Sequence, residues 1–141
     1  LGGHVVVGDR ANLGGGAGVH HFTTIGSGAF LAGLARVIKD VPPWMMVDGA
    51  PAEVRGCNRV GMQRAQMSEE DIQAVLESYR MLYREPGGDQ ESTCAVLLER
   101  FSGSETIQSI VDSIRATLCG KNGRALENQR THDKTVDPRD R

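Results

Sequence analysis

The sequence has few cysteines, little net charge and no long apolar run, and each scarcity excludes a class of protein. Three cysteines without a CxxC spacing indicate neither a disulfide framework nor a metal site, so we expect a reduced, cytoplasmic compartment and no bound metal. The net charge of −2 lacks the basic excess of a nucleic-acid-binding protein. No apolar run approaches the roughly 18 residues that cross a bilayer, and no secretory signal opens the chain.

Glycine, by contrast, is abundant and unevenly placed, because 12 of the 18 glycines fall in residues 2–56. In the same region aliphatic residues recur every six positions, at Leu1, Val7, Leu13, Val19, Ile25, Leu31 and Val37. The residue four positions after each is small or β-branched, namely Val5, Ala11, Ala17, Thr23, Ala29, Ala35 and Val41. A helix repeats near 3.6 residues and a strand near 2, so this period of six predicts a parallel β-helix in which three hexapeptides close one coil.

Two further expectations follow from the repeat. Glycine comes directly after four of the seven aliphatic residues, at Gly2, Gly8, Gly14 and Gly26. We expect these glycines at corners of the coil that need a positive φ. The chain also begins at Leu1, in the middle of a repeat and without an initiating methionine, so we expect a fragment of a longer protein.

The rest of the chain divides into three predicted segments. Two prolines in Asp40-Val41-Pro42-Pro43-Trp44 end the β-helix, which we place at residues 1–43. Residues 44–67 are predicted to be an extended connector that leaves the coil, with turns near Asp48-Gly49 and Arg55-Gly56. Residues 68–119 are predicted to be helical, with Ser68 as an N-cap before three acidic residues. The polar, non-periodic residues 120–141 are predicted to be a disordered tail.

The chain resembles the acyl-carrier-protein:UDP-N-acetylglucosamine O-acyltransferases, which begin lipid A synthesis. The resemblance covers residues 1–119 and rests on the hexapeptide run, the DVPPW string, Gly56-Cys57-Asn58-Arg59-Val60-Gly61-Met62-Gln63-Arg64, and a helix that opens Ser-Glu-Glu and contains YRMLYR. It implies a left-handed parallel β-helix, here about two coils, followed by a small α-helical C-terminal domain. Members of that family are cytoplasmic homotrimers without a cofactor. They transfer a 3-hydroxyacyl group from acyl carrier protein to the 3-hydroxyl of UDP-N-acetylglucosamine in clefts between neighbouring prisms.

The resemblance also implies roles for individual residues. Gly3 matches a glycine whose backbone N–H faces the thioester carbonyl and supports the oxyanion. Four residues match substrate-binding positions, namely His4, His20, Asn58 and Arg64. Gly33 matches the position that limits acyl-chain length, where a glycine admits a long chain. The general-base histidine of the family is expected upstream of Leu1, so we assign no catalytic base in this sequence.

The sequence departs from the family pattern at three positions. His21 stands where the family often has glutamine, Val60 where it often has an acidic residue, and Ala65 where it often has a second basic residue. These departures leave the acceptor sugar and its contacts open.

Three other functions remain as alternatives. One is another hexapeptide acyltransferase or acetyltransferase, and another is a non-catalytic trimeric remnant. The third is a carbonic anhydrase with zinc on His4, His20 and His21. It is disfavoured because adjacent residues of a strand point to opposite sides.

Overall fold

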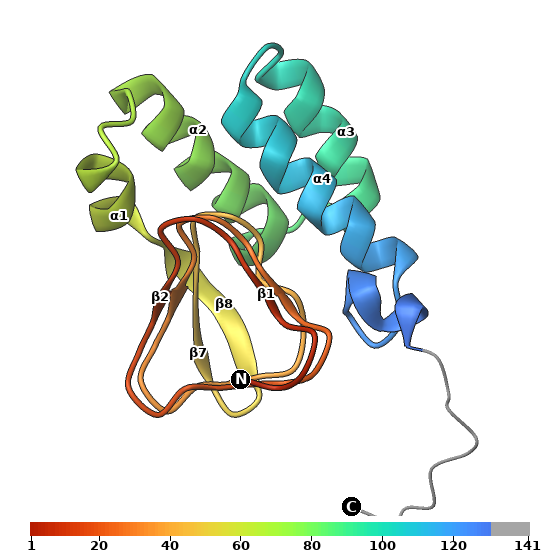
Figure 1. Cartoon of the computed structure of the whole chain (residues 1–141). Helices are drawn as coiled ribbons and strands as arrows, with labels where there is room; N and C mark the ends of the chain where they lie inside the picture. The colour runs from red at the N-terminus through yellow and green to blue at the C-terminus, as the bar shows by residue number, and fades with distance from the viewer. Residues whose placement is uncertain (131–141) are drawn as a thin grey trace, which may run out of the picture.

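The computed structural model describes residues 1–130, which form a three-sided coil of short strands with helices packed beside it (Figure 1). Each hexapeptide contributes one two-residue strand: β1 Val6–Val7, β2 Asn12–Leu13, β3 Gly18–Val19, β4 Thr24–Ile25, β5 Phe30–Leu31 and β6 Arg36–Val37. The strands pair in parallel as β1 with β4, β2 with β5 and β3 with β6. Val7, for example, lies opposite Ile25, 18 residues on. The prediction of three hexapeptides per coil is confirmed.

The aliphatic residue of each hexapeptide points into the coil. Ile25 and Leu31 are fully buried, whereas Leu1 at the end of the stack is 74% exposed. The small residues predicted beside them are buried too, with Ala29 and Ala35 at most 1% exposed. Each two-residue strand has one inward position. That position is apolar because a polar group buried there without a hydrogen-bond partner would be costly, and this produces the repeat.

The glycines after the aliphatic residues do not serve the purpose that we predicted. Positive φ values do recur every six residues, but at His4, Arg10, Gly16, Phe22, Gly28 and Leu34, of which four are not glycine. A Cβ on Gly8 or Gly14 would instead lie 2.5 Å from a backbone nitrogen of the next coil. These glycines are required by the close stacking of coils, so the prediction that they occupy positive-φ corners is wrong.

The predicted connector stays on the coil. Strand β7 (Met45–Gly49) pairs in parallel with β5, and β8 (Ala52–Cys57) returns antiparallel to β7, which completes a four-stranded sheet. The turn near Gly49 is confirmed. The turn predicted at Arg55-Gly56 is wrong, because both residues lie inside β8, where Met46 pairs with Gly56 and Val47 with Val54. Arg55 is the extra residue of a β-bulge. In the sequence, such a bulge cannot be distinguished from a turn.

Three helices occupy the predicted helical region, residues 68–119, and one further helix precedes it. They are α1 Arg59–Arg64, α2 Glu69–Tyr79, α3 Gln90–Arg100 and α4 Glu105–Cys119, and α2 continues into a π-helical turn, η1 Arg80–Arg84. Ser68 accepts a hydrogen bond from the N–H of Asp71 and is the N-cap that the sequence predicts. Helix α1 was not predicted, because its six residues are too few to show a periodicity. No helix within residues 1–130 is both long and apolar enough to cross a bilayer.

The first part of the predicted tail is ordered. Residues 120–130 include a short 3-10 helix, η2 Ala125–Gln129, beside the coil. The side chain of Arg124 is buried and donates to the carbonyl oxygen of Ile38 at 2.6 Å. The disorder prediction is therefore wrong for 120–130, because the polar residues find partners on the coil that a hydrophobic pattern does not reveal. Residues 131–141 of the predicted tail lie outside the described residues.

Candidate functional site

The predicted site residues lie at three different corners of the triangular coil. Gly3 and His4 precede β1, and His20 follows β3, so these residues share the corner between the third and first faces. Asn58 and Arg64 belong to α1 and its N-cap, beside the corner between the first and second faces. Gly33 follows β5 at the remaining corner. One copy of the chain therefore does not bring all of its predicted site residues together.

The first corner, which we call the histidine corner, carries three histidines on two neighbouring coils. The His4 ring stacks on that of Phe22, with ring centroids 4.7 Å apart and planes 11° from parallel. The Phe22 N–H donates to the Gly3 carbonyl oxygen at 3.0 Å, which joins the two coils. His4 and His20 thus lie along one edge, as their spacing of sixteen residues predicts. Within residues 1–130 no three His, Cys, Asp or Glu side chains are grouped as metal ligands.

The backbone N–H of Gly3 already has an acceptor. It donates to Nδ1 of His21 at 3.0 Å, a contact that the sequence did not predict. Only an unprotonated Nδ1 can accept this bond. A substrate carbonyl oxygen can reach the Gly3 N–H only when the His21 ring turns away.

Asn58 has a structural role that the sequence also did not predict. Its Oδ1 accepts from the N–H of Gly61 at 2.9 Å, which caps α1, and its Nδ2 donates to the Gly28 carbonyl oxygen at 2.9 Å. A carboxamide has two acceptor lone pairs and two donor hydrogens, so each end keeps one bonding position. Asn58 fixes α1 against the coil and can still contact a ligand.

A cavity of about 540 Å³ lies between α1 and the second face of the coil, and we call it the arginine cavity. Its floor contains Asn12, Phe30 and Met46, which lie side by side across β2, β5 and β7. The remaining lining residues are Arg10, Cys57, Asn58, Arg59, Val60, Gly61 and Arg64. Three guanidinium groups around a mainly apolar floor suit a ligand that has both an anionic and an apolar part.

Burial disfavours the nucleophilic form of the thiol in the arginine cavity. Burial raises the pKa of Cys57 from 9.0 to about 12, and its Sγ lies 3.8 Å from the Val75 carbonyl oxygen. A thiolate, not a thiol, carries out nucleophilic attack. Cys57 therefore contributes an apolar wall.

Gly33 lies apart from both sites. It is exposed, and a Cβ added to it would meet only the carbonyl oxygen of Gly15, at 3.4 Å. A side chain at this position is therefore compatible with the fold, and it would project outward from the third corner.

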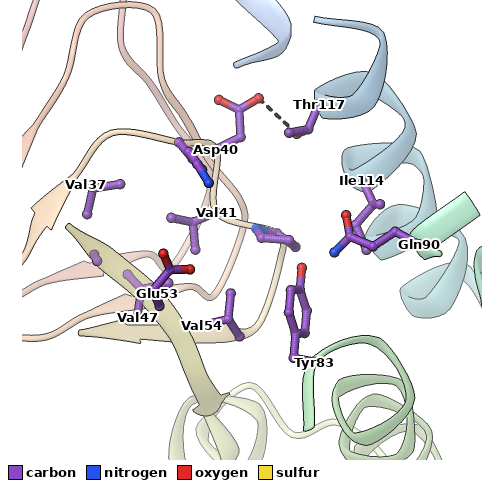
Figure 2. Close-up of a pocket in the computed structure, with 13 residues that line it drawn as sticks. Val37, Asp40, Val41, Val47, Glu53, Val54, Tyr83, Gln90, Ile114 and Thr117 are labelled. Carbon is purple, nitrogen blue, oxygen red and sulfur yellow. Dashed lines mark hydrogen bonds between the residues drawn. The ribbon is translucent and has the colours of Figure 1, made fainter. Parts of the chain in front are cut away.

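A second cavity, of about 320 Å³, separates the coil from the helices (Figure 2). Four valines line it together with polar and charged residues such as Asp40 and Glu53. Tyr83 from η1 and Gln90 from α3 point toward it. Burial raises the pKa of Tyr83, so its hydroxyl stays protonated. None of the predicted site residues lines this cavity.

Comparison with known proteins gives a consistent result. Residues 40–124 match the family model described as UDP-N-acetylglucosamine O-acyltransferase, domain 2. An acyl-(acyl-carrier-protein)–UDP-N-acetylglucosamine O-acyltransferase of Verminephrobacter eiseniae is 42% identical over 118 residues, which are 84% of this chain and 45% of that protein. One from Synechocystis sp. is 42% identical over 84 residues, which are 60% of this chain and 30% of that protein. The chain thus spans less than half the length of these relatives.

Solved structures agree. The Arabidopsis UDP-N-acetylglucosamine acyltransferase superposes with a TM-score of 0.76 at 32% identity, over 83% of this chain and 42% of that chain. The acyltransferase of Bacteroides fragilis superposes with a TM-score of 0.75 at 26% identity, over 82% of this chain and 47% of that chain. The matched parts include the coil as well as the helices.

Proposed function

The chain belongs to the UDP-N-acetylglucosamine O-acyltransferase family, and on this premise we propose that it takes part in 3-hydroxyacyl transfer from acyl carrier protein to the 3-hydroxyl of UDP-N-acetylglucosamine. This reaction is the first step of lipid A synthesis. The observation that carries the proposal is the family match over residues 40–124, which contain Asn58 and Arg64. These two residues form one wall of the arginine cavity.

The proposed reaction makes particular demands on the site. The sugar hydroxyl attacks the thioester carbonyl carbon and gives its proton to a general base. The tetrahedral intermediate carries an oxyanion, and its collapse breaks the C–S bond and expels the thiol of the carrier protein. Backbone N–H groups stabilise such an oxyanion because they are fixed before the charge develops. We assign no general base among residues 1–130.

Asn58 and Arg64 are proposed to hold the nucleotide sugar, and Gly3, His4 and His20 to act at the reacting end. Arg64 holds a phosphate of the nucleotide sugar, because its planar guanidinium donates two parallel hydrogen bonds. Gly3 supplies an oxyanion donor once the His21 ring turns away from it. His4 and His20 line the reacting end of the cleft.

The separation of the corners supports a homotrimer. The histidine corner and the arginine cavity lie at different corners of one coil, so a site that uses both needs a second copy of the chain. In the three-fold assembly that we propose, the histidine corner of one copy is placed against the arginine cavity of the next. We propose this arrangement, in the cytoplasm, where thiols such as Cys57 and Cys119 remain reduced.

The acyl chain is proposed to extend toward Gly33. A glycine leaves room there, and a close-packed cleft accepts each further methylene only where volume is empty. We therefore propose that long 3-hydroxyacyl donors are preferred over short ones.

A chimera tests the proposed function. Residues of this chain replace the matching 118-residue segment of the Verminephrobacter eiseniae relative, and transfer of a 3-hydroxyacyl group to UDP-N-acetylglucosamine is assayed. We expect the chimera to catalyse the transfer. In the same protein Arg64→Ala is expected to raise KM for the nucleotide sugar about tenfold or more, because a hydrogen bond to a charged group contributes about 1.5–3 kcal/mol. A folded chimera that binds neither substrate contradicts the proposal.

A further inference from the structure

Arg10 lies at the corner between the first and second faces of the coil, where its backbone has a φ of 59°. The same left-handed backbone recurs every six residues in the coil, so this φ places Arg10 at a corner and does not by itself indicate a ligand site. The Arg10 side chain lines the arginine cavity together with Asn58 and Arg64. Arg10 and Arg64 are 54 positions apart in the sequence, so no motif connects them.

Hydrogen bonds fix this corner against the helix that carries Arg64. The carbonyl oxygen of Asp9 accepts from the N–H of Gly28 at 2.8 Å. The Gly28 carbonyl oxygen in turn accepts from Nδ2 of Asn58 at 2.9 Å, and Oδ1 of Asn58 caps α1. The two backbone segments that carry Arg10 and Arg64 are therefore held in place before any ligand binds, which lowers the entropic cost of binding.

The charges around the cavity are unbalanced. Its ten lining residues include three arginines and no acidic residue. Arg59 pairs with Glu69 at an Nη2–Oε1 distance of 3.3 Å. Within residues 1–130, neither Arg10 nor Arg64 forms an ion pair. Arg10 from the coil and Arg64 from α1 thus line one cavity, and neither has a carboxylate partner within residues 1–130.

We propose that Arg10 is a second guanidinium contact to the diphosphate of the nucleotide sugar, in the cavity that Arg64 also lines. In this chain it replaces the basic side chain that is absent at Ala65, the C-cap residue directly after Arg64. The inference rests on the proposed function, because its ligand is the diphosphate of the proposed acceptor. A diphosphate presents oxygens on two sides, so guanidinium forks from the coil and from α1 bind it together.

Calorimetric titration of the full 141-residue chain tests the inference with three ligands, UDP-N-acetylglucosamine, UDP and uridine. We expect Arg10→Ala to weaken binding of both diphosphates about tenfold, because a charge-assisted hydrogen bond is lost, and to leave uridine binding unchanged. Arg36→Ala is the matched control, since Arg36 is an exposed arginine of β6 on another face of the coil. It is expected to bind all three ligands as the parent does.

A rescue variant separates a direct contact from a structural role. Ala65→Arg added to Arg10→Ala places a guanidinium directly after Arg64, at the C-cap of α1, and we expect it to recover most of the lost UDP affinity. Circular dichroism melts show that each variant is folded, and Arg10→Gln keeps the aliphatic stem should Arg10→Ala melt early.

The outcomes are distinguishable. If Arg64→Ala weakens UDP binding while Arg10→Ala and Arg10→Gln do not, Arg10 is no contact and the proposed function stands. If neither arginine affects UDP binding, the nucleotide sugar binds elsewhere and the inference is wrong. If the parent chain binds neither UDP nor UDP-N-acetylglucosamine, both the inference and the proposed function are wrong.

Discussion

The carboxylate of Asp40 accepts a hydrogen bond from the hydroxyl of Thr117, 77 positions later in the chain, at an Oδ2–Oγ1 distance of 3.1 Å (Figure 2). The same oxygen accepts from the N–H of Ala125 at 2.7 Å, and Oδ1 accepts from the N–H of Thr24 at 2.8 Å. One side chain therefore joins the coil, α4 and the C-terminal segment. This carboxylate is one of the contacts that hold the helices against the coil, together with those of Tyr79 and Arg124.

Asp40→Ala is expected to lower the free energy of unfolding by about 2–4 kcal/mol, because the N–H groups of Thr24 and Ala125 lose their acceptor. The Thr117 hydroxyl can still donate to the Ser113 carbonyl oxygen, at 3.0 Å. Urea unfolding measures the change. Asp48→Ala is the control, since within residues 1–130 the exposed Asp48 carboxylate accepts only from the N–H of the next residue, Gly49. A loss of equal size in both variants would mean that the contacts of Asp40 do not hold the domains together.

Neighbouring glycines of the coil are expected to differ sharply in tolerance of a methyl group. A Cβ on Gly14 would lie 2.5 Å from the backbone nitrogen of Gly33, whereas one on Gly15 would meet nothing within 4 Å. Gly14→Ala is expected to destabilise by about 1–3 kcal/mol through overpacking between coils. Gly15→Ala is expected to be neutral or to stabilise by up to about 1 kcal/mol. Thermal and urea unfolding of the pair check this, and equal effects would contradict the coil stacking.

Cysteine alkylation is expected to depend on burial. The pKa of Cys57 rises from 9.0 to about 12, so at pH 8 roughly one thiol in ten thousand is ionised. The rate at which iodoacetamide alkylates Cys57 should rise about tenfold for each pH unit up to the pKa, while the chain stays folded. Exposed Cys119 serves as the internal control and should react first at pH 8. Peptide mass spectrometry that shows equal rates at pH 8 would contradict the assignment of Cys57 as an inert wall.

Gly33→Met is expected to shift the acyl-chain preference of the active chimera from long to short 3-hydroxyacyl donors. The space beside Gly33 admits a side chain, since an added Cβ meets only one atom, at 3.4 Å, so loss of folding is not expected. Competition between long-chain and short-chain donors measures the preference. Gly87→Met is the control, because Gly87 lies in the loop before α3 and an added Cβ meets nothing within 4 Å. If Gly33→Met leaves the preference unchanged, Gly33 serves only as a corner glycine and does not limit acyl-chain length.

Some features follow from sequence because each residue acts alone or with near neighbours. The inward positions from Val19 to Val37 must be apolar in any coil with one inward residue per strand, and they are buried. Ser68 predicts a helix start because a serine side chain reaches the N–H three residues ahead without help from the rest of the chain. The period of six and the string around Asn58 were enough to indicate both the coil and the family.

The tertiary structure alone decided the features that depend on residues far apart in the chain. The corner residues His4 and Arg10 have a positive φ because coil geometry imposes it, and neither residue type signals it. The order of residues 120–130 depends on partners near Asp40, and the cavity that contains both Arg10 and Arg64 depends on how α1 packs against the coil. A periodic sequence specifies which side chains are buried, because burial repeats with the strand. It does not specify which polar groups meet, because that depends on packing between segments with no common period.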